Sequence, residues 1–249
     1  MSAPVELAKQ CLDVGLYTAD TESTLAFYRD TLGLPYEELL KVSKGNRQHR
    51  LGLRGSVLKV NESRDPLPAA PSGFRRLIIA DPLLKQPDSH TDPQGVPVDR
   101  VLPGTEGVTA VGIVMAVADV RAQVRFLTDG LWGDALGPVL TSTPQPQPQR
   151  VRIGTTVLFI EEDPLAPTSV PQRALGFRYV TIQVRDVAST HRHLVSHGFE
   201  EAMAPMRLGD TAAISFVLDP GGNWWEISQR ANLTGVLPDL PRTELPTAE

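Results

Sequence analysis

The chain has 249 residues, of which 41% are hydrophobic and 21% are charged, and its formal net charge is −5. That hydrophobic content is too high for a disordered chain, and no apolar run is long enough to span a membrane, so no membrane partner is expected. A mildly acidic chain without blocks of Lys and Arg also argues against nucleic acid as a partner. The single cysteine, Cys11, can form neither an internal disulfide nor a cysteine-rich zinc site, which predicts a reducing, cytoplasmic setting.

The first predicted elements are a strand and a helix near the N-terminus. A β-rich run from Asp13 ends at Asp20, and an amphipathic stretch then continues to Gly33. Asp20 suits a helix N-cap, because its carboxylate can accept the unpaired N–H groups of the first turn. Gly33 suits the left-handed position that follows a helix. Further strands are expected at residues 36–42, 47–53 and 57–61.

The same layout recurs twice along the chain. A strand over residues 112–119 ends at Asp119 and precedes a helix that closes at Gly130. A strand over residues 179–186 ends at Asp186 and precedes a helix that closes at Gly198. Later strands are predicted at residues 151–153, 157–161, 212–218 and 224–228. The repeated module is therefore β-α-β-β-β.

A degenerate copy of the module lies between the first and the third. Gly73-Phe-Arg-Arg resembles Gly176-Phe-Arg-Tyr, and Asp92-Pro-Gln-Gly resembles Asp219-Pro-Gly-Gly. The sequence thus predicts an α+β fold of four βαβββ modules, the second one degenerate. We expect modules one and two to form one domain at residues 10–104, modules three and four to form another at 107–230, and a Pro-rich tail at 231–249.

Two motifs tie these modules to a known family. Leu25-Ala-Phe-Tyr-Arg-Asp-Thr-Leu-Gly33 follows the first strand and its Asp, and Asp219-Pro-Gly-Gly-Asn-Trp-Trp-Glu226 enters the last strand. With four modules in register, the chain resembles the vicinal oxygen chelate superfamily, which includes glyoxalase I, extradiol dioxygenases, methylmalonyl-CoA epimerases and bleomycin resistance proteins. The resemblance extends to about Arg230 and implies two cup-shaped, mixed-sheet domains of the glyoxalase/dioxygenase type.

The resemblance also implies where metal ligands would lie. In family metal sites, the first strand of one module supplies a His, and the first strand of its paired module supplies a His or a Glu. The last strands supply a Glu. The corresponding positions here are Asp13, Arg76, Gly112 and Tyr179 on first strands and Lys59, Asp99, Phe159 and Glu226 on last strands. Modules three and four keep only Glu226, and modules one and two mix two acids with two bases that would repel a cation. We therefore expect no metal and no other cofactor, and an unconventional site for iron, manganese or zinc is the alternative.

Strand alternation then selects the candidate site residues, because side chains two positions apart share a face. Tyr17 accompanies Asp13, Gln183 and Thr181 accompany Tyr179, and Trp224 accompanies Glu226. Candidate catalytic residues are Glu226 as general base or acid, Tyr179 as proton donor, and His49 on a middle strand. Candidate substrate-binding residues are Trp224, Gln183, Asp13, Tyr17, Lys59, Arg76 and Asp99. The alternative for Trp224 and Tyr179 is a place in the core, and the alternative for Asp13, Lys59, Arg76 and Asp99 is a set of salt bridges.

These residues predict a small-molecule enzyme with metal-independent acid–base chemistry, of the lyase or isomerase type, on a small substrate such as an aromatic one. Two alternatives remain open: a non-catalytic binding protein like the bleomycin resistance members, and a dioxygenase with an unconventional metal site. The expected partner is a small-molecule ligand, and exposed sheet edges make a homodimer plausible. The sequence does not say which of the two cups is the working one.

Overall fold

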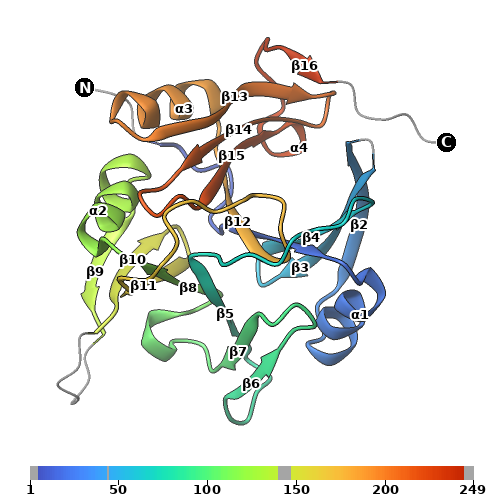
Figure 1. The fold of residues 1–249 in the computed structure, drawn as a ribbon, viewed down its shortest axis with the longest axis vertical. Helices are drawn as coiled ribbons and strands as arrows, with labels where there is room; N and C mark the ends of the chain where they lie inside the picture. Colours follow the sequence, from blue (N-terminus) through green and yellow to red (C-terminus); the bar gives the residue numbers. More distant parts are fainter. Residues whose placement is uncertain (1–4, 44, 140–146, 244–249) are drawn as a thin grey trace.

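The structure is a computed structural model that describes residues 5–43, 45–139 and 147–243. These residues form two curved mixed sheets with helices at their flanks, as expected for the α+β class (Figure 1). Within the described ranges, no helix has both the length and the apolar character needed to cross a membrane.

The larger sheet has nine strands in the order β16-β13-β14-β15-β12-β1-β4-β3-β2. Its strands are β1 (Asp13–Thr18), β2 (Tyr36–Ser43), β3 (Asn46–Leu53), β4 (Ser56–Ser63), β12 (Gly176–Gln183), β13 (Glu200–Leu208), β14 (Ala212–Leu218), β15 (Trp224–Arg230) and β16 (Arg242–Thr243). The smaller sheet has seven strands in the order β6-β7-β5-β8-β11-β10-β9. Its strands are β5 (Phe74–Ala80), β6 (Asp88–Thr91), β7 (Pro97–Val101), β8 (Val111–Val117), β9 (Asp134–Pro138), β10 (Gln149–Ile153) and β11 (Thr156–Glu162).

The sheets join the modules in a different order from the one expected. β1 of the first module lies antiparallel to β12 of the fourth, and β5 of the second lies antiparallel to β8 of the third. The first and fourth modules therefore share the nine-stranded sheet, and the middle two share the seven-stranded sheet. This corrects the expected pairing of module one with two and of module three with four. The pattern within a strand specifies its buried face but not its partner, so the sequence repeats could not distinguish the two arrangements.

The helices begin as predicted. They are α1 (Thr21–Ala26) with its wider continuation η1 (Phe27–Thr31), η2 (Thr105–Gly107), α2 (Val120–Arg125) with its continuation η3 (Phe126–Gly130), α3 (Val187–Ser196) and α4 (Ala231–Thr234). The carboxylates of Asp20, Asp119 and Asp186 each accept a hydrogen bond from a backbone N–H three residues later. The three predicted N-caps are confirmed.

The predicted helix ends are confirmed at two of three glycines. Gly33 and Gly198 have the expected positive φ angles, 71° and 85°. Gly130 does not have a positive φ; it is the last residue of η3, and Leu131 is the C-cap. A β-carbon at Gly130 would lie 2.7 Å from the ring of Phe199 and 3.1 Å from Leu194. This glycine is therefore explained by the close approach of η3 to the fourth module rather than by a left-handed cap.

The main hydrophobic core lies between the two sheets, which contribute one apolar face each. Leu16, Val180 and Trp225 of the nine-stranded sheet belong to the same buried cluster as Ile113 and Leu158 of the seven-stranded sheet. The other face of the seven-stranded sheet carries a second apolar cluster that contains Ile78, Val108, Val114, Val157 and Phe159. Apolar side chains thus fill this second cup, whereas the outer face of the nine-stranded sheet carries buried polar and charged groups.

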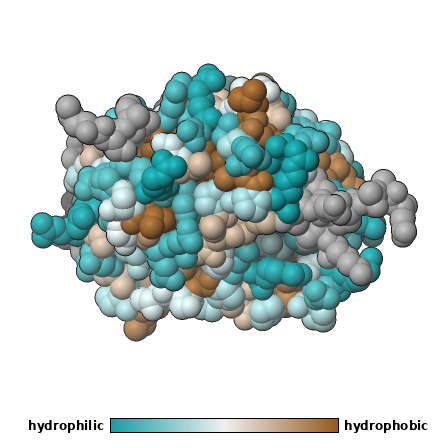
Figure 2. Space-filling view, turned by 90° about the horizontal axis from the view of Figure 1, so that it is seen from above, coloured by the Kyte–Doolittle hydropathy of each residue, from teal (hydrophilic) through white to brown (hydrophobic). Residues whose placement is uncertain are grey.

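The C-terminal segment extends the nine-stranded sheet. After α4 the chain returns to β16, which pairs in parallel with β13, and residues 244–249 of the predicted tail lie outside the described part. On the face of the molecule in Figure 2, hydrophobic side chains form small separate patches among hydrophilic ones. No broad apolar surface is visible on that face.

Candidate functional site

A cavity of about 330 Å³ lies against the outer face of the nine-stranded sheet, and we call it the cup cavity. Its wall includes Tyr17, Lys59, Tyr179, Gln183 and Glu226. The first module supplies two of these residues and the fourth supplies three. The volume is in the range of small-molecule sites. Five of the residues selected from the sequence therefore meet in one cavity.

A buried ion pair forms the polar floor of the cup cavity. The Lys59 ammonium lies 2.7 Å from Glu226 Oε2 and donates to Thr181 Oγ1, also at 2.7 Å. Thr181 Oγ1 in turn donates to Glu226 Oε2 at 2.6 Å. Strand register brings these groups together, because Thr181 lies opposite Glu226 on β12 and β15. The Lys59 and Glu226 side chains are only 4% and 10% exposed, so water screens their attraction weakly.

Burial and neighbouring charges act on Lys59 in opposite directions. Burial lowers the pKa of Lys59 below its ordinary value, because desolvation disfavours the ammonium. The carboxylates of Glu226 and Asp13 oppose this change, and the nearby Arg50 guanidinium adds to it. The net direction is a lowered pKa, which makes Lys59 a stronger proton donor than a lysine in water.

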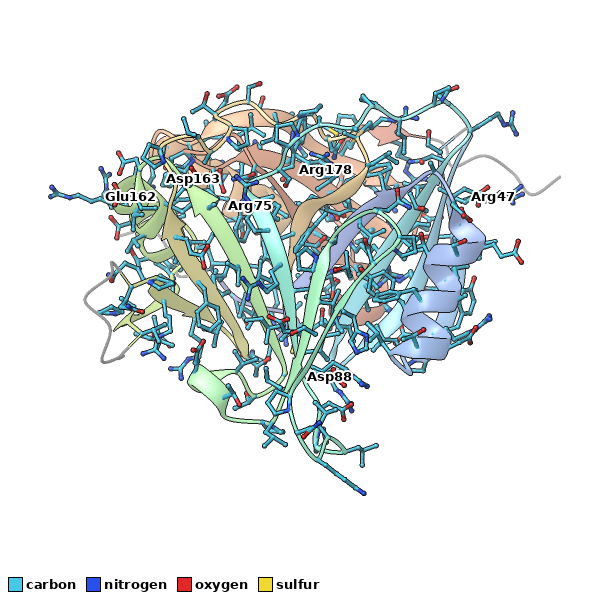
Figure 3. The ribbon with its side chains drawn as sticks, turned by 60° about the horizontal axis from the view of Figure 1, so that its bottom comes forward. Arg47, Arg75, Asp88, Glu162, Asp163 and Arg178 are labelled. Carbon is cyan, nitrogen blue, oxygen red and sulfur yellow. The ribbon has the colours of Figure 1, made fainter. Side chains whose placement is uncertain are left out.

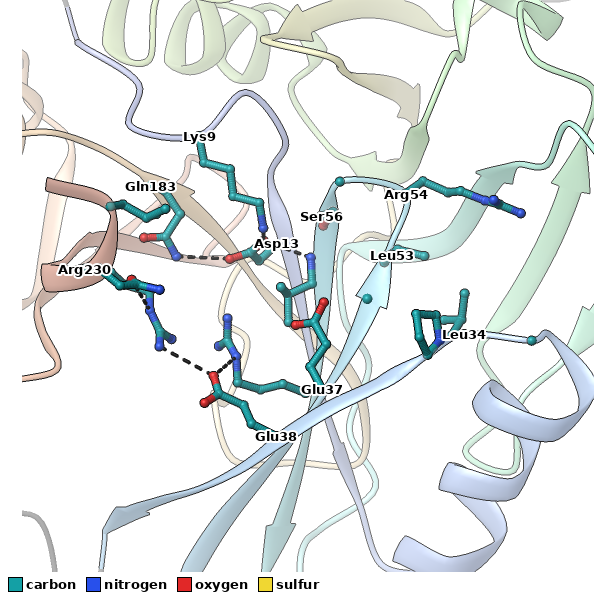
Figure 4. A pocket seen from close by; sticks show the side chains of 18 of the residues that line it. Lys9, Asp13, Leu34, Glu37, Glu38, Leu53, Arg54, Ser56, Gln183 and Arg230 are labelled. Carbon is teal, nitrogen blue, oxygen red and sulfur yellow. Dashed lines mark hydrogen bonds and ion pairs between the residues drawn. The ribbon is translucent and has the colours of Figure 1, made fainter.

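Asp13 extends the polar floor to the neighbouring strand β1. Its carboxylate is fully buried and accepts from Lys9 Nζ at 2.6 Å, Gln183 Nε2 at 3.0 Å and the Val57 backbone N–H at 2.9 Å. Burial alone would raise the pKa of Asp13, but Lys59, Lys9 and these hydrogen bonds outweigh it and hold the pKa below its usual value of 3.8. Asp13 lines a second cavity of about 630 Å³ beside the β3–β4 turn, which we call the hairpin cavity (Figure 4).

The lowered pKa of Asp13 gives a pH-dependent contribution to stability. A carboxyl group whose folded pKa lies below its unfolded pKa stabilises the fold above the unfolded value, and that contribution is lost as pH falls through the folded value. We expect the free energy of unfolding of the wild type to fall more steeply below about pH 4 than that of Asp13→Asn. Urea titrations at several pH values test this. Parallel pH profiles for the two proteins would contradict it.

Tyr179 presents its hydroxyl group to the cup cavity. Its oxygen accepts from Gln48 Nε2 at 3.2 Å and from Asn61 Nδ2 at 3.1 Å, so its own O–H remains for a third partner. No hydrogen bond to a described residue uses that proton. Burial raises the pKa of Tyr179 well above its usual value, and the charge of Glu226 adds to the effect, so the phenol keeps its proton. The ring lies over Gly15, where a β-carbon would be 2.2 Å from it.

Part of the lining of the cup cavity is apolar and partly aromatic. Ile214 and Phe216 of β14, Met203 of β13 and Tyr17 of β1 line it. Trp224 contacts this wall edge-on through Phe216, and its indole N–H donates to the carbonyl of Val170 at 2.7 Å. Trp224 therefore packs against Phe216 and holds the loop before β12, and it is not among the residues that line the cavity.

Three other predicted site residues lie elsewhere. Arg76 and Asp99 belong to the seven-stranded sheet and form an ion pair at 3.0 Å near the surface. They do not join Asp13 and Lys59, because the first two modules lie in different sheets. His49 is on β3, but its ring contacts Tyr36 and Glu62 on the side opposite the cup residues of that strand. It does not line the cup cavity.

The site contains several polar residues that were not predicted from the sequence. Gln48 and Arg50 on β3, Asn61 on β4 and Arg230 on β15 all line the cup cavity. Strand alternation could have identified some of them, because residues two positions apart share a face of the sheet. Asn61 is two residues from Lys59, and Arg50 is two residues from Gln48. Arg230 continues the series from Glu226 at a spacing of four residues.

The residues of the site do not fit a family metal ion. The strand positions that the resemblance assigns to ligands hold Asp13, Lys59, Tyr179 and Glu226, and the Lys59 ammonium already binds the Glu226 carboxylate. A cation at this place would be repelled by Lys59 and would find only two carboxylates. Across the described ranges, no group of three or more His, Cys, Asp or Glu side chains could hold a metal ion.

Comparisons with known proteins agree with this fold. The family model for the Glyoxalase/Bleomycin resistance protein/Dioxygenase superfamily matches residues 10–227. Among solved structures, a mutant of glyoxalase I from Zea mays is similar with a TM-score of 0.70 and 14% identity, covering 91% of this chain and 97% of that one. A candidate dioxygenase from Bacillus subtilis is similar with a TM-score of 0.65 and 12% identity, covering 97% and 93%.

At these identities the structural likeness shows the fold alone. A search of the curated proteins found no significant match. The family model nevertheless covers most of the sequence, and its match includes both the first and the last module of the nine-stranded sheet. The chain therefore belongs to the glyoxalase/bleomycin resistance protein/dioxygenase superfamily, the vicinal oxygen chelate superfamily.

Proposed function

We propose that the protein is a metal-independent acid–base enzyme, of the isomerase or lyase type, that acts on a small molecule in the cup cavity. The observation that carries the proposal is the buried Lys59–Glu226 pair, which places a positive charge and a carboxylate side by side on the cavity floor. Metal-dependent members use a cation to polarise a substrate oxygen, and here Lys59 supplies the positive charge. In a dry cavity such a charge stabilises a developing oxyanion strongly.

The geometry supports a proton-transfer reaction next to a carbonyl group. Glu226 takes a proton from the carbon beside the carbonyl, and the C–H electron pair becomes the new C=C bond of an enolate. Lys59 donates a hydrogen bond to the enolate oxygen, and Tyr179 is a second donor on the same floor. Return of the proton to another face or carbon completes an isomerisation. Departure of a leaving group from the next carbon, with its electron pair, completes an elimination.

Replacing Glu226 with glutamine tests this chemistry. The probe is a panel of small carbonyl compounds with a C–H next to the carbonyl, incubated in D₂O with a chelator and followed by proton NMR. We expect the wild type to exchange that C–H for deuterium in at least one compound, and Glu226→Gln to slow the exchange by about 10²–10⁴-fold, the usual contribution of a general base. Glu200→Gln, at an exposed position on β13, is the matched control and is expected to retain the wild-type rate.

A second candidate is a non-catalytic binding protein. Its support is the aromatic side of the cavity, where Tyr17 and Tyr179 lie 6.5 Å apart and Phe216 lies 6.1 Å from Tyr179, measured between ring centroids. Tight binding of a compound that is recovered unchanged, with no exchange in any member of the panel, would favour the binder over the enzyme. A homodimer and a reducing, cytoplasmic setting, the latter suggested by the lone Cys11, remain predictions.

A further inference from the structure

The cup cavity carries an excess of positive charge. Its titratable lining comprises a single carboxylate, Glu226, two tyrosines and the cations Lys41, Arg50, Lys59, Arg173 and Arg230. Lys59 neutralises Glu226, so the other cations determine the sign of the potential in the cavity. A cavity lined by one sign of charge with apolar walls favours ligands of the opposite sign.

Arg50 and Arg230 are the cations best placed to bind such a ligand. Both approach the same atom, Glu38 Oε1, Arg50 through Nε at 3.0 Å and Arg230 through Nη2 at 3.5 Å (Figure 4). Two largely buried guanidinium groups thus share one half-exposed carboxylate, and the cluster keeps a net positive charge. Burial lowers the pKa of Arg230, and repulsion from Arg50 adds to this effect. The planar guanidinium fork is suited to a carboxylate.

An unpaired acceptor lies beside these arginines. Gln183 is 1% exposed and lines the same cavity, and its amide nitrogen donates to Asp13. Its carbonyl oxygen Oε1 is buried without a hydrogen-bond partner. A buried acceptor of this kind is unfavourable unless a donor reaches it. A ligand with an O–H or N–H group would satisfy it.

The charged residues of the two cavities indicate which of them binds the body of the ligand. Arg50, Gln183 and Arg230 line both the cup cavity and the hairpin cavity. The hairpin cavity is lined by three carboxylates, from Asp13, Glu37 and Glu38, and by four cations, from Lys9, Arg50, Arg54 and Arg230. The cup cavity has one carboxylate, from Glu226, and five cations, so it has the larger excess of positive charge and favours an anion more. The apolar wall formed by Tyr17, Ile214 and Phe216 is likewise on the cup side.

From these observations we infer the class of ligand: a small carboxylate with an apolar or aromatic body and a hydroxyl or amide donor next to the carboxylate. Its carboxylate binds Arg50 and Arg230, its donor reaches Gln183 Oε1, and its body packs against Tyr17 and Phe216 beside Lys59 and Glu226. This inference rests on the proposed function only in placing the reacting carbon near Glu226. The binding of the carboxylate stands on Arg50, Arg230 and Gln183 alone.

Three related probes test the inference by isothermal titration calorimetry. Phenyllactate has the carboxylate, the hydroxyl and the aromatic ring, phenyllactamide lacks the charge, and 3-phenylpropanoate lacks the hydroxyl. We expect the wild type to bind phenyllactate at least about tenfold more tightly than phenyllactamide, because only the acid can form hydrogen bonds between a charged carboxylate and the two arginines. We expect weaker binding of 3-phenylpropanoate as well.

Variants of the two arginines test whether these residues give the preference for the acid over the amide. Arg50→Met and Arg230→Met are each expected to bind the acid and the amide within about threefold of each other, which corresponds to loss of one charged contact. Arg47→Met is the matched control, because Arg47 lies on the same strand as Arg50 but at an exposed position at the edge of the molecule (Figure 3). It is expected to keep the wild-type preference.

The outcomes separate this inference from the proposed function. Equal affinity of the wild type for phenyllactate and phenyllactamide, no binding of any probe, or an unchanged preference in both arginine variants overturns the carboxylate site. The deuterium-exchange experiment with Glu226→Gln is independent of these results. A carboxylate preference without exchange leaves a binding site but no acid–base enzyme, and exchange without the preference leaves the enzyme but a different substrate class.

Discussion

Replacing Lys59 with methionine is expected to lower the free energy of unfolding by about 3–5 kcal/mol, because it leaves the Glu226 carboxylate buried without a cation. Glu226 then loses both the ammonium at 2.7 Å and most of its charge compensation. Chemical denaturation followed by tryptophan fluorescence measures the change. Trp224 and Trp225, two of the three tryptophans, adjoin Glu226 in β15 and contribute to the signal.

The double variant Lys59→Met, Glu226→Leu identifies the cause of this loss. If an unpaired charge is responsible, removing both charges restores much of the stability, because well-packed apolar groups often replace a buried pair at little cost. Arg76→Met is the control, since the Arg76–Asp99 pair also occupies positions that the family uses for metal ligands, in the seven-stranded sheet, but lies near the surface. We expect it to cost less than about 1 kcal/mol. Additive losses in the double variant would contradict the account of the pair.

Replacing Arg178 with methionine is expected to lower the free energy of unfolding by about 2–3 kcal/mol through a different mechanism. Arg178 is fully buried, and burial lowers its pKa to about 10 (Figure 3). Its guanidinium donates to the carbonyls of Ala70, Pro71 (3.0 Å), Ala174 (3.0 Å) and Leu175 (2.6 Å). One side chain thus joins the segment before β5 to the segment before β12.

That junction also affects the cup cavity. Gln172 and Arg173, in the segment that Arg178 holds, line the cavity. We expect limited proteolysis to cut residues 163–175 faster in Arg178→Met than in the wild type. Arg178→Lys should not restore the wild-type behaviour, because an ammonium cannot reproduce the planar fork of donors. Arg185→Met, at a half-exposed arginine on the surface, is the control. Unchanged cleavage and unchanged stability in Arg178→Met would contradict this role.

Much of the fold could be predicted because its signals are local. The strand–Asp–helix pattern at Asp20, Asp119 and Asp186 depends on capping within one turn, and all three caps are present. Alternation also placed Asp13, Tyr17, Tyr179, Gln183 and Glu226 on one face of the nine-stranded sheet.

The remaining features depend on contacts between distant segments. Lys59 and Glu226 are 167 positions apart, and nothing in either strand indicates that β4 and β15 lie in one sheet. The sequence therefore placed Lys59 beside Arg76 and Asp99, whereas the structure places it beside Glu226. In the second cup, Val108 and Phe159 belong to the apolar cluster on the outer face of the seven-stranded sheet. Arg178 carried no local signal, because its partners are backbone carbonyls of two loops.

We propose that the Lys59 ammonium takes the place of the family metal ion beside Glu226. Metal analysis of the purified protein by inductively coupled plasma mass spectrometry tests it most directly, on samples prepared with and without added iron, manganese and zinc. We expect substoichiometric metal in every sample and equal metal content in the wild type and Glu226→Gln. One equivalent of iron, manganese or zinc in the wild type that is lost in Glu226→Gln would contradict it.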